Sequence, residues 1–361
     1  MRGHFQAIHL SKIWPITLAT EAGVFRVENG VFTECIAAPA RELPNGRALL
    51  RSLFTRKHYL FEKYNGRNWA VPDVGEFTHI IVHYPALLEF VRGKRGLTAD
   101  VIFDTHNNER EYFESVAART AGFAKPIFIR RQASISERII KQAAANIDAT
   151  VSVSESDREW VAGLCSSQTR HFVVPNNLFR YEPTTWTGRK SVLYVGSLNV
   201  NMNLQALEWF TTRVWPALKE SAPEVDFIVA GRNPAVGLVS DLERKGIQVV
   251  ANAPSLTGLY ADAMFSVIPA ASGSGGKIKV GEALAHGVPV LTTAQGLVGQ
   301  PAAIRECCIV NDDPGEWVSI IREHLGREER SSKLWDAKVE NALTETYFGS
   351  SIMQIAGFIG A

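Results

Sequence analysis

The sequence predicts an α/β protein with two domains, each built on a parallel sheet covered by helices. The chain has 361 residues, which is too long for one ordinary core. Short apolar runs alternate with helical patterns from residue 79 onward, and right-handed crossovers turn such alternation into parallel sheets. We expect the domains to span 1–180 and 191–334, with the polar stretch 181–190 as the linker.

Composition excludes several classes of protein. The chain is 46% apolar and 21% charged with a net charge of +1, whereas bulk nucleic-acid binding usually shows as a basic excess, so no nucleic acid is expected. Its four cysteines form no C-x-x-C metal motif, and Cys307 and Cys308 are adjacent, which predicts free thiols. Polar residues near Met1 argue against a secretory signal, and no apolar run reaches the roughly 20 residues that span a bilayer. We therefore expect a cytoplasmic protein.

The second domain reads as repeated strand and helix units. Helical stretches such as Leu204 to Leu218 separate its strands. The turns that follow parallel strands meet at one edge of the sheet, where open α/β sheets bind ligands. The predicted strands are Ser191 to Val195, Asp226 to Ala230, Ile247 to Ala251, Met264 to Pro269, Val290 to Thr293 and Cys308 to Asn311.

A glycine-rich stretch, Ser272 to His286, follows one of these strands and opens a helix. Free N–H groups and the helix dipole make such a turn a cradle for phosphate, and Lys277 and Lys279 add charge there. A plain tight turn is the alternative. Glu282 lies three residues after Lys279, so both share a helix face and a carboxylate can accept hydrogen bonds from sugar hydroxyls. The combination suits a nucleotide-sugar. A Walker A loop is unlike this stretch, because Ile278 stands where serine or threonine is needed.

The segment from Gly275 to Val290, G-G-K-I-K-V-G-E-A-L-A-H-G-V-P-V, resembles the donor-site signature of family-four glycosyltransferases. That family has the GT-B fold, in which two Rossmann-like domains face each other across a cleft. Many members carry two glutamates in an E-x7-E spacing. Here Glu282 is the second, and Ser274 stands at the first position. In this fold the final helix, here 335–361, crosses back to the first domain.

The resemblance implies a retaining, metal-independent glycosyltransferase of polysaccharide or glycoconjugate biosynthesis. Its donor is a nucleotide-diphosphate sugar, and its acceptor is a saccharide, a lipid-linked molecule or another hydroxyl compound. His106 and Glu282 are the expected catalytic residues. For Arg232, the alternative to phosphate binding is a salt bridge on the surface. The expected donor-binding residues are Gly196, Ser197, Arg232, Asn252, Ala253, Gly275, Gly276, Lys277, Ile278, Lys279 and Glu282.

His106 follows the predicted strand Asp100 to Asp104. It matches a Thr-His pair after the corresponding strand of the family, where the histidine faces the transferred sugar. The alternative is a helix cap, in which Asn107 or Asn108 caps the next helix and His106 is incidental.

The first 75 residues are the least typical of the family. The stretch from Val24 to Ile36 alternates around Asn29-Gly30, which predicts a hairpin with a type I′ turn. The glycine-rich loop that opens family members is missing. Residues 41–67 are basic with interleaved leucines and phenylalanines, which fits either an amphipathic surface helix or a patch that contacts an anionic membrane or acceptor.

Two other functions fit the same residues. A binding partner that kept the fold without turnover is favoured by Ser274 and the missing opening loop. A nucleotide-sugar epimerase on a similar scaffold is the other. Donor binding without transfer would indicate the binding partner, and an epimerised nucleotide product formed without acceptor would indicate the epimerase.

Overall fold

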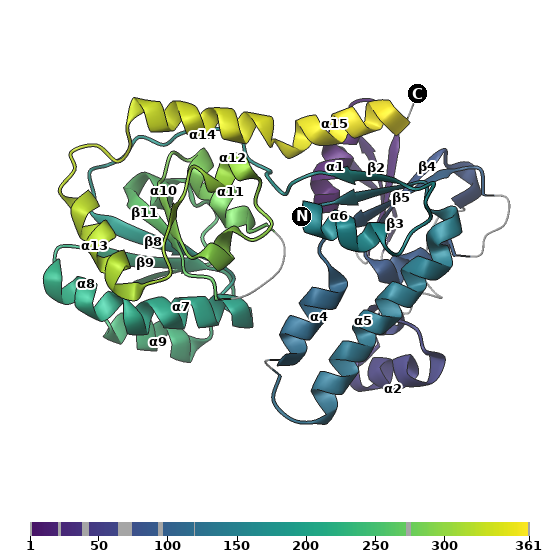
Figure 1. Cartoon of the computed structure of the whole chain (residues 1–361), viewed down its shortest axis with the longest axis horizontal. Helices are drawn as coiled ribbons and strands as arrows, with labels where there is room; N and C mark the ends of the chain where they lie inside the picture. Colours follow the sequence, from purple (N-terminus) through teal and green to yellow (C-terminus); the bar gives the residue numbers. More distant parts are fainter. Residues whose placement is uncertain are drawn as a thin grey trace. The chain divides into compact units, whose positions relative to one another are not determined.

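A computed structural model shows two compact units. One comprises Met1–Pro175 with Gly349–Ala361, and the other Asn176–Phe348. Each is an α/β structure built on a parallel sheet, as the sequence predicts. Figure 1 shows the elements along the chain. The structure describes residues 2–20, 23–37, 43–63, 74–92, 97–118, 120–271 and 276–359.

The second unit holds a six-stranded parallel sheet in the order β10-β9-β8-β11-β12-β13. The order reverses between β8 and β11, which is the topological switch point of a Rossmann-type sheet. Predicted and observed strands agree to within about two residues at each end. The strands are β8 (Ser191–Val195), β9 (Asp226–Gly231), β10 (Gln248–Ala251), β11 (Ala263–Ile268), β12 (Val290–Thr292) and β13 (Ile309–Val310).

Helices cover both faces of this sheet (Figure 1). The predicted helix Leu204 to Leu218 is two helices, because the chain breaks at Val214 before Pro216, which has no N–H for a continuing helix. The helices are α7 (Asn201–Arg213), α8 (Trp215–Ser221), α9 (Val236–Arg244), α10 (Thr257–Asp262), α11 (Ile278–Ala285), η4 (Ala294–Leu297), α12 (Ala302–Arg305), α13 (Pro314–Leu325) and α14 (Lys333–Glu345).

Successive residues of the central strand β8 point into two different cores. Val192 and Tyr194 pack with α7, α8 and α13 on one face, and Leu193 packs with α10, α11 and α14 on the other. A strand that is buried on both faces needs a continuous apolar run, and Ser191–Val195 supplies one. The two cores fix the sheet, and with it the loops at its carboxyl edge.

Arg330 holds the end of this unit to its start. The side chain is 7% exposed, and burial lowers its pKa to about 10. Its guanidinium donates to the carbonyl oxygens of Tyr260 at 2.8 Å and Ala263 at 3.1 Å, and to those of Thr184 at 2.8 Å and His286 at 3.0 Å. The segment predicted as the linker, 181–190, is thereby tied to the second unit.

The first unit contains a four-stranded parallel sheet in the order β4-β5-β6-β7. Its core includes the fully buried Phe103 and Ile140. The long helices α4 and α5 run beside each other (Figure 1). These elements are β4 (His79–His83), β5 (Asp100–Thr105), β6 (Ala149–Ser152), β7 (Arg170–Val173), η1 (Val74–Glu76), η2 (Pro85–Phe90), α4 (Glu109–Ala118), α5 (Ala124–Ala143), η3 (Ala144–Asn146) and α6 (Glu155–Ala162).

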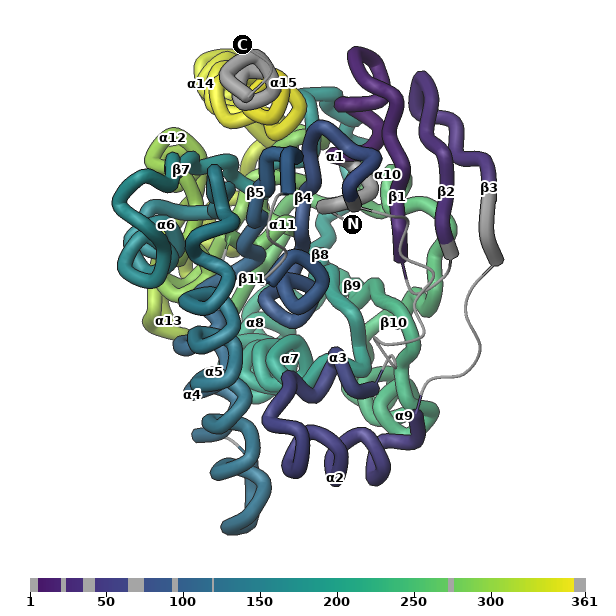
Figure 2. The backbone as a smooth tube through the Cα atoms, turned by 90° about the vertical axis from the view of Figure 1, so that its right-hand side faces the viewer, coloured from purple at the N-terminus to yellow at the C-terminus, as the bar shows by residue number. Residues whose placement is uncertain are grey.

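A separate antiparallel sheet lies near the N-terminus. Helix α1 (Arg2–Leu10) precedes strands β1 (Ile16–Thr20), β2 (Gly23–Glu28) and β3 (Val31–Ala37), which lie side by side in Figure 2. The predicted hairpin turn is confirmed, because Asn29 has φ 50° and Gly30 has φ 81°, as a type I′ turn requires.

The basic stretch predicted at 41–67 forms two short helices where it is described, α2 (Asn45–Thr55) and α3 (Tyr59–Lys63). Its ends, 41–42 and 64–67, lie outside the described residues. The C-terminal stretch is also two helices, α14 and α15 (Phe348–Ile359), and Gly349–Ala361 groups with the first unit. Among the described helices, none combines the length and apolar character needed to cross a bilayer.

Candidate functional site

The predicted phosphate cradle lies where β11 leads into α11. Gly275 is outside the described residues, and Gly276 and Lys277 lead directly into the helix. No side chain caps the first turn of α11, so its N–H groups are available to an anion. Lys277 and Lys279 flank this turn. Burial lowers the pKa of each lysine to about 8, and the charge of Lys277 lowers that of Lys279 further.

Asn203 connects Lys279 to the first loop of this unit. Lys279 Nζ donates to Asn203 Oδ1 at 3.2 Å, and Asn203 Nδ2 donates to the carbonyl oxygen of Ser197 at 3.1 Å. The ammonium also lies 5.0 Å from the ring centroid of Tyr194. One amide side chain therefore brings together the two loops that the sequence proposed for a diphosphate.

A second pair of loops meets at Gly196 and Gly231. A Cβ atom on Gly231 would lie 2.0 Å from the carbonyl oxygen of Gly196, so only glycine fits there. Leu198 N donates to the carbonyl oxygen of Arg232 at 2.8 Å, and the Arg232 residue is exposed. Asn252 has φ 53°, and its side chain accepts from Asn233 N at 2.9 Å. These contacts hold Gly196, Arg232 and Asn252 along one edge of the sheet, with Ala253 next in the chain.

Glu282 lies one turn into α11 and is half-buried. Burial raises the pKa of its carboxyl group, and the hydroxyl of the fully buried Tyr260 lies beside it. Tyr260 in turn stacks on His286 with ring centroids 4.6 Å apart. A buried aromatic pair therefore lies next to the Glu282 carboxyl group.

The stretch Gly296 to Gly299, which follows β12, supports the cradle. A Cβ atom on Gly276 would lie 2.9 Å from the carbonyl oxygen of Gly299. Gln300 Nε2 donates to the carbonyl oxygen of Lys277 at 2.8 Å. The segment after β12 thus holds the backbone of Lys277, the residue before α11, in place.

A second polar cluster lies in the first unit, where β4 and β5 end. His83 and Asp104 are register partners in these strands. His83 Nδ1 lies 3.0 Å from His106 Nε2 and 3.8 Å from Asp104 Oδ2, and Asp104 is fully buried. Gln6 of α1 donates to Asp104 Oδ2. The three ligand atoms of His83, Asp104 and His106 lie within 4.8 Å of one another, close enough to hold a divalent cation.

The surroundings of His106 favour a functional role over an incidental one. The helix cap of the alternative reading is Asn108, whose Oδ1 accepts from Arg110 N at 3.1 Å and Glu111 N at 3.3 Å. His106 instead stacks on Tyr84 with centroids 4.4 Å apart. Tyr84 has φ 66° and ψ 138°, a conformation that is costly for a tyrosine, and such strain gathers at functional sites.

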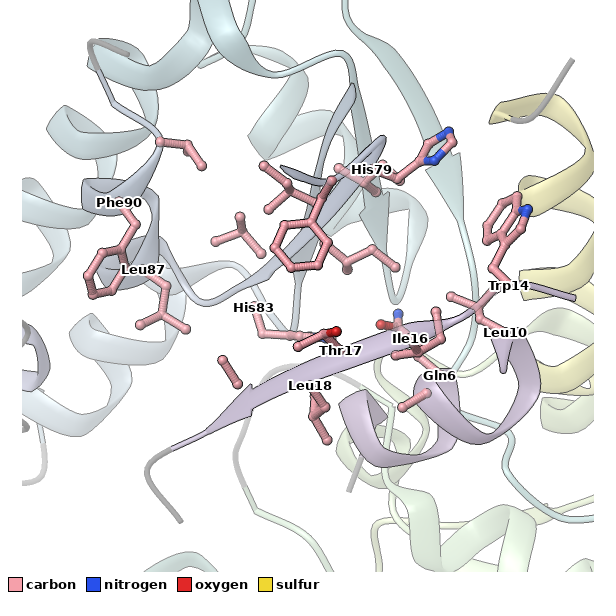
Figure 3. Close-up of a pocket in the computed structure, with 18 of the residues that line it drawn as sticks. Gln6, Leu10, Trp14, Ile16, Thr17, Leu18, His79, His83, Leu87 and Phe90 are labelled. Carbon is pink, nitrogen blue, oxygen red and sulfur yellow. The ribbon is translucent and has the colours of Figure 1, made fainter. Parts of the chain in front are cut away.

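Beside this cluster lies a cavity of about 230 Å³ within the first unit (Figure 3). Its walls come from α1, β1, β4 and η2 and are mainly apolar, with Leu10, Leu18 and Phe90 among them. Gln6 and His83 also line it, which links the cavity to the polar cluster. At one wall Trp14 stacks on His79 with centroids 5.1 Å apart.

Sequence reasoning missed several residues of both sites. Asn203, Gln300 and Tyr260 act through partners that are far away in the sequence, so no local pattern marks them. A sequence signal for His83 was available. His83 is the last residue of the strand His79–His83, and that strand pairs with the one that leads to His106. Asp104 was placed in the sequence as an ordinary strand residue, although a carboxylate at 0% exposure needs a polar partner.

A comparison with protein families finds that residues 189–327 match the model described as "Glycosyl transferases group 1". This part of the chain is therefore similar to that family. The match covers all six strands of the parallel sheet of the second unit, from β8 to β13, together with α11, both lysines and Glu282.

Solved structures with the same fold include several GT-B glycosyltransferases. The chain resembles TarM at a TM-score of 0.59 and 15% identity, covering 78% of this chain and 54% of TarM. It resembles a UDP-forming trehalose-phosphate synthase from Burkholderia xenovorans at a TM-score of 0.60 and 12% identity, over 96% of this chain and 91% of that one. For HepE of Anabaena in complex with UDP and glucose, the values are 0.53 and 13%, over 80% and 78%. The chain therefore has the GT-B fold, and residues 189–327 of its second unit match the group 1 glycosyltransferase model.

A curated relative comes from Klebsiella pneumoniae. It is described as an uncharacterized 44.6 kDa protein in the cps region, and it is 22% identical over 223 residues. The match covers 58% of this chain and 55% of the relative, so the chain spans about half the length of this relative and of TarM.

Proposed function

We propose that the chain is a glycosyltransferase whose second unit binds a nucleotide-diphosphate sugar and whose acceptor is a saccharide, lipid-linked or other hydroxyl compound. The contact that carries the proposal is the one between Lys279 and Asn203, which joins the α11 cradle to the Ser197 loop. Both lysines are partly buried, and a lysine loses part of its hydration there, which lowers its pKa and favours a site that uses the charge. Two of them beside an uncapped helix start make a strong diphosphate site.

The comparisons support a uridine nucleotide as the first donor to test. HepE and TarM were solved with UDP, and the trehalose-phosphate synthases are described as UDP-forming. The cps-region relative fits a role in polysaccharide or glycoconjugate synthesis. Gly196, Ser197 and Arg232 would lie by the diphosphate, and Asn252 and Ala253 by the base.

In the proposed reaction, the bond between the anomeric carbon and the phosphate oxygen breaks, and its electron pair leaves with the nucleoside diphosphate. The acceptor oxygen forms the new bond on the same face of the sugar, so configuration is retained. Its proton passes to the departing diphosphate. Lys277, Lys279 and the α11 N–H groups stabilise the charge that develops there, which is electrostatic catalysis by preorganised donors. Glu282 would accept hydrogen bonds from donor hydroxyls.

We also propose that His106 contributes to turnover rather than to donor binding. Replacing it by asparagine keeps size and polarity but removes the proton-transfer capacity of an imidazole. The expected result for His106→Asn is donor affinity within about twofold of wild type and a loss of about 10²-fold in kcat, in line with a lost acid or base.

The proposed reaction needs no metal, because cationic side chains take the role that a divalent ion plays elsewhere. Turnover is therefore expected to be unchanged after dialysis against EDTA. The matched measurement adds Mn²⁺ or Zn²⁺ back to the dialysed protein. If activity falls with EDTA and returns with one ion, the metal-independent mechanism is wrong, and His83, Asp104 and His106 are the first ligands to test.

The main test is a panel of UDP-, GDP- and dTDP-sugars, with product detected by mass spectrometry and UDP affinity by calorimetry. Lys277→Ala and Lys279→Ala are each expected to weaken UDP binding by about 10- to 100-fold, because each removes a charge-assisted contact worth about 1.5–3 kcal/mol. Glu282→Ala is expected to lower turnover of the sugar donor with less effect on UDP. Lys333→Ala is the control, since Lys333 is exposed at the start of α14.

Three results would contradict the proposal. Wild-type turnover that is matched by both lysine variants would place the donor elsewhere. Donor binding without transfer to any acceptor would instead identify a binding partner that kept the fold. Formation of an epimerised nucleotide without acceptor would identify an epimerase.

We further propose that α2 contacts an anionic membrane. Phe54 is 85% exposed and Leu50 55% exposed, and Arg47 and Arg56 are exposed beside them. Apolar side chains interleaved with arginine on an amphipathic helix fit an anionic lipid surface. The chain is expected to sediment with phosphatidylglycerol vesicles but not with phosphatidylcholine vesicles, and Phe54→Glu is expected to weaken this binding severalfold. Equal sedimentation of both vesicle types would contradict it.

A further inference from the structure

The first unit contains a buried side-chain oxygen without a hydrogen-bond partner among the described residues, and it belongs to a residue that lines the apolar cavity. Gln6 is 2% exposed and lines the cavity. Its Nε2 donates to Asp104, while its Oε1 has no hydrogen-bond partner. A buried carbonyl oxygen without a donor is costly, so such an atom indicates a ligand or water that donates to it.

The cavity itself is suited to an apolar group. Its volume of about 230 Å³ equals roughly eight water volumes of about 30 Å³. Leu10, Leu18, Leu87 and Phe90 contribute to its walls (Figure 3). Apolar walls that are left in contact with water gain free energy when an apolar group covers them. An occupant with a short aliphatic or aromatic body would cover these walls.

The backbone explains why the space is open. β4 is the edge strand of the parallel sheet, and β1 is the edge strand of the antiparallel sheet. Both strands line the cavity, and within the described ranges no hydrogen-bonded pairing joins them. The cavity therefore lies between two strand edges, with α1 on another side, and is not a packing defect inside one sheet.

The polar groups of the cavity lie together. His83 lines it and pairs with His106 at 3.0 Å, and Asp104 lies 3.8 Å from His83 and accepts from Gln6. The cavity is thus apolar with one polar end, where a hydroxyl could donate to Gln6 Oε1.

We propose that this cavity binds the acceptor, and that the acceptor is an alcohol with an apolar body whose hydroxyl donates to Gln6. The identity of the occupant as acceptor rests on the proposed transferase function, whereas the binding of an apolar alcohol does not. A free sugar, which has no apolar body, would gain little from Leu18 or Phe90.

The probe is 1-octanol, with octyl methyl ether as a match that lacks the hydroxyl proton, and glucose as the polar comparison. Binding to the full chain is measured by calorimetry without donor. Wild type is expected to bind 1-octanol about tenfold tighter than the ether, as one neutral hydrogen bond implies, and not to bind glucose. Gln6→Leu is expected to abolish this preference and keep ether binding.

A second variant fills the cavity. Leu18→Trp is expected to weaken 1-octanol binding at least tenfold, while Leu334→Trp, at an 84% exposed position of α14, leaves it unchanged. Both variants are expected to keep the wild-type circular dichroism spectrum and thermal unfolding curve, which shows that the first unit folds. Equal affinity for the alcohol and the ether, or unchanged binding in Leu18→Trp, would overturn the proposal.

The two proposals fail in different ways. If UDP binds and transfer occurs to a saccharide while 1-octanol does not bind, only the cavity proposal is wrong. If 1-octanol binds with the expected pattern and no sugar nucleotide binds, the transferase proposal is wrong and the cavity is a site for apolar alcohols alone.

Discussion

Lys279 and Asn203 form a hydrogen bond of 3.2 Å between helices α11 and α7. Their positions are 76 residues apart in the chain. Asn203 holds Ser197 with its other amide atom at 3.1 Å, so it keeps the lysine and the loop in register before any ligand arrives. Such preorganisation lowers the cost of ordering the site when a diphosphate binds.

This relationship predicts the effect of changing Asn203. Asn203→Asp places a carboxylate where Asn203 Oδ1 accepts from Lys279, which neutralises the lysine and repels a diphosphate. We expect UDP affinity to fall by at least tenfold, and by more than in Asn203→Ala, which only removes the hydrogen bond. Calorimetric titration with UDP at two salt concentrations checks this, because the repulsion weakens as salt rises. An aspartate variant that binds UDP as tightly as the alanine variant would show that this side chain is remote from the diphosphate.

Donor affinity is expected to depend on pH above neutrality. The pKa values of Lys277 and Lys279 are lowered to about 8 by burial, so both lose protons as pH rises from 7 to 9. The charge of a sugar-nucleotide diphosphate is constant in this range, and binding favours the protonated lysines. Affinity for UDP-glucose should therefore fall above pH 8, by up to about tenfold per pH unit for each lysine.

Calorimetry in buffers of different ionisation enthalpy measures how many protons the protein takes up when the donor binds. Wild type should take up protons on binding near pH 8. Lys279→Arg, which stays charged, should show a smaller pH dependence. An affinity that is constant from pH 7 to 9 would mean that neither lysine contacts the donor.

Gly231 predicts a stability effect with a clean control. A Cβ atom there would lie 2.0 Å from the carbonyl oxygen of Gly196 and 2.6 Å from Leu198, and backbone cannot move aside cheaply. Gly231→Ala should cost several kcal/mol of unfolding free energy in the second unit, or prevent folding. Gly237→Ala, in α9 with nothing within 4 Å of the new atom, should be neutral or stabilise by up to about 1 kcal/mol. Thermal unfolding of both variants decides; a harmless Gly231→Ala would contradict the close approach of the loops.

Glu109 predicts a pH-dependent stability of the first unit. It is 8% exposed, and burial raises its pKa to about 7 from an ordinary value of 4.5, against the hydrogen bond from Ser136. The folded state then binds more protons than the unfolded state between pH 4.5 and 7, so this group lowers stability as pH rises through that window. Glu109→Gln should raise the unfolding free energy by about 1–3 kcal/mol at pH 8 and little at pH 4.5.

The control for this measurement is Glu111→Gln, because Glu111 is exposed on the same helix. Chemical denaturation at pH 5 and pH 8 should separate the two variants. A gain for Glu109→Gln that is the same at both pH values would show that the carboxyl group does not titrate in this window.

The strands and helices of the second unit were predicted well because each is determined by residues that are close together in the sequence. Apolar runs such as Ser191–Val195 and Val290–Thr292 are strands, and the glycine-rich stretch before Ile278 leads into α11. Each is fixed by burial and chain direction within a few residues. The type I′ turn at Asn29-Gly30 is predictable for the same reason, since few residues adopt positive φ.

The rest depends on contacts between distant residues. Nothing near Asn203 in the sequence indicates Lys279, and nothing near Gln6 indicates Asp104, which lies 98 residues away. The single helix predicted from Leu204 to Leu218 is interrupted at Val214, and the cause is local, because Pro216 has no N–H for a continuing helix. The cavity could not be predicted, because it exists only where two strand edges fail to pair.

The residues that match the family model, 189–327, are fewer than those of the compact second unit, 176–348. Arg330 lies in the difference between the two ranges. The family match ends at residue 327 and starts after Thr184, so it omits both the guanidinium and one of the carbonyl groups it binds. A fragment trimmed to 189–327 would leave the carbonyl groups of Tyr260, Ala263 and His286 buried without that donor. Whoever wishes to express the donor half alone should cut at 176 and 348 instead.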